Sequence, residues 1–254
     1  MNDPLVASIG TTHPWNIAGV GLDARIGWEL GVRVVTAVAA VSAQDAHGVR
    51  ALHTIPASIL RAQLRAIPWD DVRAVRIGAL THAESVTEIA AALRDANDVP
   101  AVVDPVIRAS SGEAFADDAT MRAIREKLLT LPNVIVTPNL DEAARLLGAP
   151  EITRETMRDA SCRLRSMGVL AVLLKGGHLA GEPADVLAHA GGVEMFVGER
   201  ASVDMRATGC TLAMSLACSL ARGEAVLDAV ISARRFVRDA IERAPLFQGL
   251  HVPY

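Results

Sequence analysis

The segment VIVTPNLDEA, residues 134–143, combines the two features that decide the fold of this chain. Val134–Val136 is a short, unbroken apolar run, which is typical of a strand buried on both faces of a parallel sheet. The residues that follow turn polar, and Asn139 stands where the N-cap of a new helix is expected. A buried strand that leads directly into a helix is one β–α unit, and most of the chain repeats this unit.

Short apolar runs alternate with longer amphipathic segments on both sides of this unit. The other predicted strands are Val6–Ile9, Val32–Val38, Val72–Ile77, Ala101–Val103 and Leu170–Leu174, and the predicted helices are Gly21–Leu30, Pro56–Ala66, Glu84–Ala96, Asp117–Leu129 and Arg154–Ser166. After Lys175 the pattern changes to a hairpin of Asp185–His189 and Glu194–Val197, a helix from near Gly209 to Ala221, and a last helix over about Glu224–Arg243. We therefore predict an α/β fold with a mostly parallel sheet and helices on both faces.

The bulk properties narrow the class of protein further. The chain has 254 residues, of which 51% are hydrophobic, and its net charge is −4. It has no basic run that would attract nucleic acid or an anionic membrane, and its apolar runs are shorter than the roughly 20 residues that span a bilayer. Three cysteines without metal-ligand spacing, and no signal-peptide pattern, favour reduced thiols in a cytoplasmic protein. We expect one domain over residues 1–254.

Ligands of open α/β sheets bind at the carboxyl ends of the strands, and the most informative polar cluster is Arg206–Thr211, ahead of an Ala/Leu-rich helix. Small residues at a helix start leave free N–H groups and a positive dipole end, which together bind anions. Cys210 in the first turn is expected to have a lowered pKa, which would suit a base or a nucleophile. The alternative is an ordinary N-cap with a buried cysteine.

Three further clusters follow predicted strands. Lys175-Gly176-Gly177-His178 places a lysine where it can reach a phosphate, although a surface turn fits equally well. Asn139 and Glu142 share a face of an opening helix and could serve Mg²⁺, or they could simply cap the helix. Asp104, in Val103-Asp104-Pro105-Val106, could hold a metal or a substrate, or could belong to a plain Asp-Pro turn.

Two pieces nearer the N-terminus complete the set of candidates. Ala18, Gly19 and Asp23 open the first crossover helix, and Gln44 follows the second strand. A side-chain amide can both donate and accept hydrogen bonds, as the edge of a heterocyclic ring requires. Taken singly, each of these pieces also fits a turn or a cap.

The order and spacing of these motifs resemble the hydroxymethylpyrimidine/phosphomethylpyrimidine kinases of thiamin biosynthesis, in the ribokinase superfamily. The resemblance extends from about Val6 to Phe247 and is most specific in Thr137–Ala143, Lys175–His178 and Thr208–Leu212. It implies a ribokinase-like three-layer α/β/α sandwich with a small or absent lid. It also implies ATP-dependent phosphoryl transfer to a hydroxymethyl group, with Mg²⁺, in two successive steps in the full-function enzymes. An edge strand or the Asp185–Val197 hairpin could support a homodimer, which we expect.

The resemblance also implies roles for individual residues. Gln44 matches the glutamine that reads the pyrimidine edge, and Ala18, Gly19, Asp23 and Val106 lie on the substrate side. Asp104 and Glu142 match acidic positions near Mg²⁺ and the phosphates, and Asn139, Lys175, Thr208 and Gly209 match ATP contacts. Ala207–Cys210 matches the anion hole, with Lys175 and Cys210 as catalytic residues. Cys210 stands where this subfamily has its proposed base and where ribokinase and its other relatives usually have Asp.

This sequence departs from the family pattern mainly on the substrate side. The loop Thr12–Ile17 is one residue longer than usual and lacks a Gly pair, and its Trp15 could stack on a ring or cover the loop. Ala79 replaces a common Met, which could widen the pocket. Ala207 replaces the first Gly of the anion hole, which is tolerable only if its φ is negative.

Arg206, in Met205-Arg206, replaces part of a Thr-His lead-in and adds a candidate phosphate contact. These departures keep two alternatives open. One is a pyridoxal-type or other heterocyclic-alcohol kinase on the same fold. The other is a non-catalytic, pyrimidine-binding regulatory protein.

Overall fold

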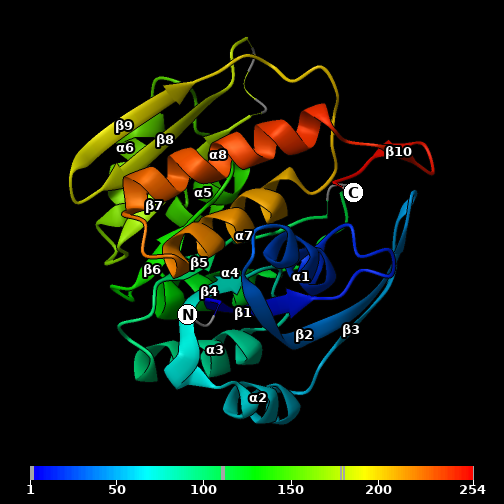
Figure 1. Ribbon diagram of the computed structural model, residues 1–254. Helices are drawn as coiled ribbons and strands as arrows, with labels where there is room; N and C mark the ends of the chain where they lie inside the picture. Colours follow the sequence, from blue (N-terminus) through cyan, green and yellow to red (C-terminus); the bar gives the residue numbers. More distant parts are fainter. Residues whose placement is uncertain (1–2, 110–111, 178, 180, 254) are drawn as a thin grey trace.

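A single twisted sheet of nine strands forms the centre of the protein in the computed structural model, which describes residues 3–109, 112–177, 179 and 181–253 (Figure 1). The strands lie in the order β3-β2-β1-β4-β5-β6-β7-β8-β9. Their bounds are β1 Leu5–Thr11, β2 Arg33–Asp45, β3 Gly48–Thr54, β4 Val72–Ile77, β5 Ala101–Val103, β6 Val134–Val136, β7 Ala171–Gly176, β8 Ala184–His189 and β9 Gly192–Val197. From β2 to β7 along this order neighbouring strands are parallel, whereas β3, β8 and β9 pair antiparallel with their neighbours.

Helices cover both faces of the sheet. The bounds are α1 Gly19–Glu29, α2 Ala57–Ala66, α3 Ala83–Asp95, α4 Asp118–Ala123, α5 Leu140–Leu147, α6 Met157–Arg165, α7 Thr208–Ala221 and α8 Val226–Glu242. Side chains of α1, α7 and α8 share one buried core, and α2 to α6 share the other. Neighbouring residues of a strand alternate between the two cores, as Val102 and Val103 do. The predicted three-layer α/β/α sandwich with a mostly parallel sheet is confirmed.

Several predicted boundaries coincide with the structure and others differ. Strands β4, β5 and β6 have the predicted bounds. The predicted helix Asp117–Leu129 is an α-helix only to Ala123 and continues as a π-helical turn over Ile124–Leu128. Strand β2 extends to Asp45 and turns into β3. This strand could not be predicted from the sequence because it is half exposed and lacks an apolar run.

The chain ends in a short hairpin that was also missed. Strand β10, Leu246–Phe247, pairs antiparallel with β11, Leu250–His251. His251 bridges to Met205, and the backbone N–H of Arg206 donates to the His251 carbonyl at 2.9 Å. This hairpin therefore holds the segment that leads into α7.

Parallel strands bring their carboxyl ends to one edge of the sheet, and α7 begins above that edge. The polar clusters after β1, β5, β6 and β7 consequently converge there. His178, part of the Lys175–His178 motif, lies outside the described residues. No helix in the described part of the chain has the length and apolar character needed to cross a bilayer.

Candidate active site

A cleft of about 850 Å³ opens along the carboxyl edge of the sheet. Every predicted site residue except Asp23 lies in its wall: Ala18, Gly19, Gln44, Asp104, Val106, Asn139, Glu142, Lys175, Ala207, Thr208, Gly209 and Cys210. Segments that are far apart in the sequence thus line one cleft, as expected at the carboxyl ends of the strands in an open α/β sheet.

One end of the cleft is formed by the N-terminus of α7. Ala207 is the N-cap residue, and no side chain caps the helix. Within the described residues, the backbone N–H groups of Thr208, Gly209 and Cys210 make no backbone hydrogen bond. Unpaired N–H groups and the positive end of the helix dipole make this end suited to an anion.

The backbone of Ala207 is strained. Its φ is 57° and its ψ is 28°, in the left-handed region that glycine adopts readily and alanine does not. The condition under which Ala207 would be tolerated without cost, a negative φ, is therefore not met. The surrounding structure stabilises this conformation, for example through the Thr211 N–H and Oγ1, which both donate to the Ala207 carbonyl at 2.9 Å.

Lys175 lies opposite this helix start and is paired with Asp104. The distance from Lys175 Nζ to Asp104 Oδ1 is 2.8 Å, and Thr137 Oγ1 is 3.4 Å from the same oxygen. A Cβ on Gly209 would lie 3.2 Å from Lys175 Nζ, so glycine allows the ion pair to rest against the first turn of α7. Burial acts to lower the pKa of Lys175, but the Asp104 and Glu142 carboxylates raise it, so the ammonium is charged at neutral pH.

Asn139 and Glu142 form a complete capping box at the start of α5. Asn139 Oδ1 accepts from the Glu142 N–H, and Glu142 Oε2 accepts from the Asn139 N–H, both at 2.8 Å. The helix-cap alternative is thus confirmed, while both residues also line the cleft. Burial raises the pKa of Glu142 to about 7 despite the opposing charge of Lys175.

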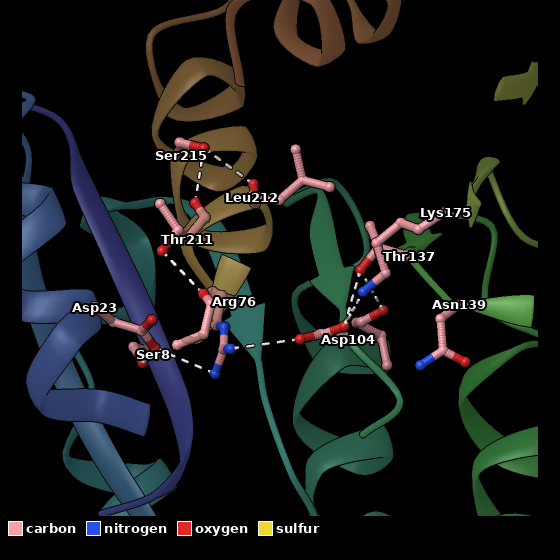
Figure 2. A network of polar contacts seen from close by, with 12 residues as sticks. Ser8, Asp23, Arg76, Asp104, Thr137, Asn139, Lys175, Thr211, Leu212 and Ser215 are labelled. Carbon is pink, nitrogen blue, oxygen red and sulfur yellow. Dashed lines mark hydrogen bonds and ion pairs between the residues drawn. The ribbon is translucent and has the colours of Figure 1, made fainter. Parts of the chain in front are cut away.

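Arg76, on β4, is the residue that sequence reasoning missed. Its side chain is 1% exposed, and Figure 2 shows it between Asp23 and Asp104. Nη1 is 3.2 Å from Asp23 Oδ2 and Nη2 is 3.8 Å from Asp104 Oδ2. Two features of the sequence could have pointed to Arg76: it is a charged residue inside a predicted buried strand, and Gly78 follows two residues later. The glycine is needed because a Cβ at position 78 would lie 1.9 Å from Arg76 Nη1.

Asp23 lies beneath the cleft and not in its wall. The residue is completely buried, and its Oδ2 accepts a hydrogen bond from Ser8 Oγ at 2.6 Å in addition to its ion pair with Arg76. Ser8 and Arg76 both contact Oδ2, and Asp23 lies outside the cleft wall, so the expectation that Asp23 contacts substrate stays a prediction, and the position of Asp23 favours a role through Arg76. Burial raises the pKa of Asp23, and Arg76 and Ser8 oppose that shift.

The prediction of a lowered pKa for Cys210 is wrong. Burial raises the pKa of this thiol more than the neighbouring Arg76 guanidinium and the Gly19 N–H lower it. Helix position alone therefore did not decide the protonation state, because the surrounding protein excludes water from the charged form. At neutral pH Cys210 is a thiol that faces a buried cation.

The other end of the cleft is formed by the loop after β1 and the end of β2. Gln44 Nε2 donates to Ser42 Oγ at 2.6 Å. Gly19 has a φ of +62°, and a Cβ there would lie 2.2 Å from the Thr11 carbonyl oxygen, so only glycine fits. Trp15 is not part of the cleft wall. Its ring packs nearly perpendicular to that of Phe247, with centroids 5.1 Å apart, so it covers the loop.

The fold and this cleft define a small-molecule kinase of the ribokinase-like class. A phosphomethylpyrimidine kinase from Clostridium difficile 630 superposes with a TM-score of 0.84 at 28% identity, over 94% of this chain and 100% of that chain. An ADP complex of Bacillus subtilis pyridoxal kinase superposes with a TM-score of 0.89 at 26% identity, over 98% and 96% of the two chains.

Sequence comparison identifies the family. The family described as phosphomethylpyrimidine kinase matches residues 16–254. A hydroxymethylpyrimidine/phosphomethylpyrimidine kinase from Streptomyces coelicolor is 36% identical over 252 residues, which cover 97% of this chain and 92% of that protein. The chain belongs to the phosphomethylpyrimidine kinase family.

Proposed function

We propose that this protein uses ATP to phosphorylate 4-amino-5-hydroxymethyl-2-methylpyrimidine, its monophosphate, or both, in thiamin biosynthesis. One observation carries this proposal: at one end of the cleft, the uncapped start of α7 faces the Lys175–Asp104 ion pair. Phosphoryl transfer asks a protein mainly for positioning and for charge stabilisation, and both elements supply these. The names of the relatives support the pyrimidine as substrate.

The phosphates of ATP are expected at the α7 end. Lys175 supplies a fixed positive charge, and the N–H groups of Thr208, Gly209 and Cys210 surround the group in transfer as an anion hole with Ala207. Asn139 lies beside them, because its backbone bridges to Lys175. As the substrate hydroxyl oxygen bonds to the γ-phosphorus, the bond from that phosphorus to ADP breaks and the hydroxyl proton leaves.

Asp104 and Glu142 fit a Mg²⁺ ion that accompanies ATP. Both carboxylates line the cleft and are nearly inaccessible, at 2% and 5% exposed. Among the described residues no three His, Cys, Asp or Glu side chains are grouped as a metal site, and Mg²⁺ typically needs only one or two carboxylates beside phosphates and water. When bound, Mg²⁺ would neutralise phosphate charge.

The pyrimidine is expected at the opposite end, with Gln44 on its polar edge and Ala18, Gly19 and Val106 around the ring. Asp23 is assigned a supporting role through Arg76. Cys210 is the proposed acceptor of the hydroxyl proton. Because its resting form is a thiol, this role requires the thiolate that Arg76 and the Gly19 N–H stabilise.

A coupled ATP-consumption assay tests the proposal with a panel of hydroxymethylpyrimidine, its monophosphate, pyridoxine and pyridoxal. Turnover of either pyrimidine supports it. Turnover of pyridoxal or pyridoxine alone would favour the second candidate, which the likeness to the pyridoxal kinase fold supports. Binding of pyrimidine and ATP without any turnover would favour the regulatory alternative.

We further propose that residues 1–254 act as one kinase domain, which forms a homodimer in the cytoplasm and binds neither nucleic acid nor membrane. The continuous sheet from β3 to β9 supports the single domain. Light scattering tests the dimer, and fractionation of cells tests the location.

A further inference from the structure

His13 is a buried polar residue that the proposed function does not use. It lies in the loop between β1 and α1, is 7% exposed, and lines the cleft at the same end as Gln44. His13 belongs to the loop Thr12–Ile17, where this sequence departs from the family pattern. A buried side chain with two polar ring atoms, at the wall of a substrate cleft, is expected to make defined hydrogen bonds.

The local backbone fixes the state of the His13 ring. The backbone N–H of Trp15 donates to Nδ1 at 3.1 Å, and the Asn16 N–H donates to the His13 carbonyl at 2.9 Å. A ring nitrogen that accepts a hydrogen bond carries no proton, so the proton of the neutral ring is on Nε2. Burial lowers the pKa of His13, which keeps the ring neutral at neutral pH.

The loop that carries His13 is held at several points. The Thr12 N–H donates to the Ala40 carbonyl at 3.0 Å, and Ser42 Oγ donates to the Thr12 carbonyl. On the far side Trp15 packs against Phe247 of β10. His13 is therefore positioned before any ligand arrives, which reduces the entropy that binding must overcome.

His13 and Gln44 present complementary polar atoms to the cleft. Within the described part of the chain, His13 Nε2 has no hydrogen-bond partner. The atom keeps some contact with solvent, since it is not among the fully buried polar atoms that lack a partner. Gln44 uses Nε2 to donate to Ser42, which leaves Oε1 as an acceptor. The site thus offers one N–H donor from His13 and one carbonyl acceptor from Gln44.

We propose that His13 is a specificity-determining residue, which donates from Nε2 to a ring nitrogen of the substrate while Gln44 Oε1 accepts from the adjacent exocyclic amine. This inference rests on the proposed function. A 4-aminopyrimidine has an accepting ring nitrogen next to a donating amine, which matches the pair. In the 4-oxo analogue the ring nitrogen carries a proton and the exocyclic oxygen accepts, so both contacts are reversed.

The test compares kcat/KM for the 4-amino and 4-oxo hydroxymethylpyrimidines in the wild type and in H13N. An asparagine keeps an acceptor for the Trp15 N–H in an Asx turn but removes the donor at the position of Nε2. We expect H13N to raise KM for the amino substrate about 10- to 100-fold, the effect of one lost hydrogen bond in a buried site, and to lower the preference for amino over oxo. KM for ATP should not change.

Two further variants make the outcome decisive. H13Q places an amide donor near the position of Nε2 and is expected to recover part of the preference for the amino substrate. H53N is the matched control, because His53 is an exposed histidine of β3. If the wild type phosphorylates the amino substrate but H13N keeps its KM and its preference, the role of His13 is refuted and the proposed function stands. If the wild type turns over neither pyrimidine, both are refuted.

Discussion

Replacement of Arg76 by methionine is expected to be among the most destabilising single changes in this protein. Arg76 lies between two carboxylates that are 0% and 2% exposed, Asp23 and Asp104. Methionine fills a similar volume but carries no charge, so R76M leaves Asp23 with Ser8 as its one remaining polar partner among the described residues. Asp23 Oδ1 already has no hydrogen-bond partner in the folded protein.

The magnitude follows from the burial of the pair. Removal of one partner from a fully buried ion pair costs about 3–5 kcal/mol, because the other charge stays desolvated. For a chain of this size, each kcal/mol lowers Tm by about 2–4 °C, so R76M should lower Tm by roughly 6–20 °C. The double variant R76M/D23N should recover a part of this loss, since the unpaired carboxylate is then absent as well.

Urea unfolding at neutral pH, followed by circular dichroism, measures these differences for R76M, D23N and the double variant. R73M is the matched control, because Arg73 lies on the same strand but is exposed, and it should change stability by less than about 0.5 kcal/mol. A loss below about 1 kcal/mol for R76M, or a double variant that is less stable by the sum of the two single losses, would refute this account of Arg76.

Three more predictions concern the phosphate end of the cleft. A207G should stabilise the protein by about 1 kcal/mol in thermal melts, because glycine relieves the left-handed backbone at φ 57°; no gain would show that the conformation is not strained. If Cys210 accepts the proton, kcat should rise with pH by up to about tenfold per unit through the neutral range, because burial raises the pKa of its thiol. C210D should flatten that rise and C210A should lose most turnover while ATP binding is retained; normal turnover by C210A would exclude the role. Protonation of Glu142 stabilises the fold fully below pH 4.5, and this stabilisation is lost as pH rises through its folded pKa of about 7. E142Q should therefore gain stability relative to the wild type between about pH 4.5 and pH 7, and keep a constant advantage at higher pH, in urea titrations. A difference that is independent of pH would contradict the raised pKa.

The parts of the fold that the sequence predicted best are the strands buried on both faces. β5 and β6 are short apolar runs between polar boundaries, as is typical of strands inside an α/β sheet, and β4 has four apolar residues beside Arg73 and Arg76. The strand β3 and the terminal hairpin were missed because they are half exposed, so their residues alternate weakly or not at all. Tertiary pairing, and not a local pattern, makes them strands.

The site shows the same division. Lys175, Asn139 and Gly209 could be predicted because each follows a strand end or opens a helix in a recognisable motif. Arg76 could not be placed in the same way, since its role depends on Asp23 and Asp104, which approach it from α1 and β5 only in the folded chain. The protonation state of Cys210 was mistaken for the same reason, because burial is a property of the assembled site.

Trp15 gives the substrate loop an optical reporter of its own. The chain has three tryptophans, and the environments of the other two differ from that of Trp15. Trp28 is 87% exposed, and Trp69 Nε1 donates a hydrogen bond to the Leu64 carbonyl. The Trp15 ring lies 6.0 Å from the His13 ring, between the cleft wall and Phe247. In a W28F/W69F background, its emission would follow occupation of the pyrimidine end without a label, and so separate substrate binding from the arrival of ATP.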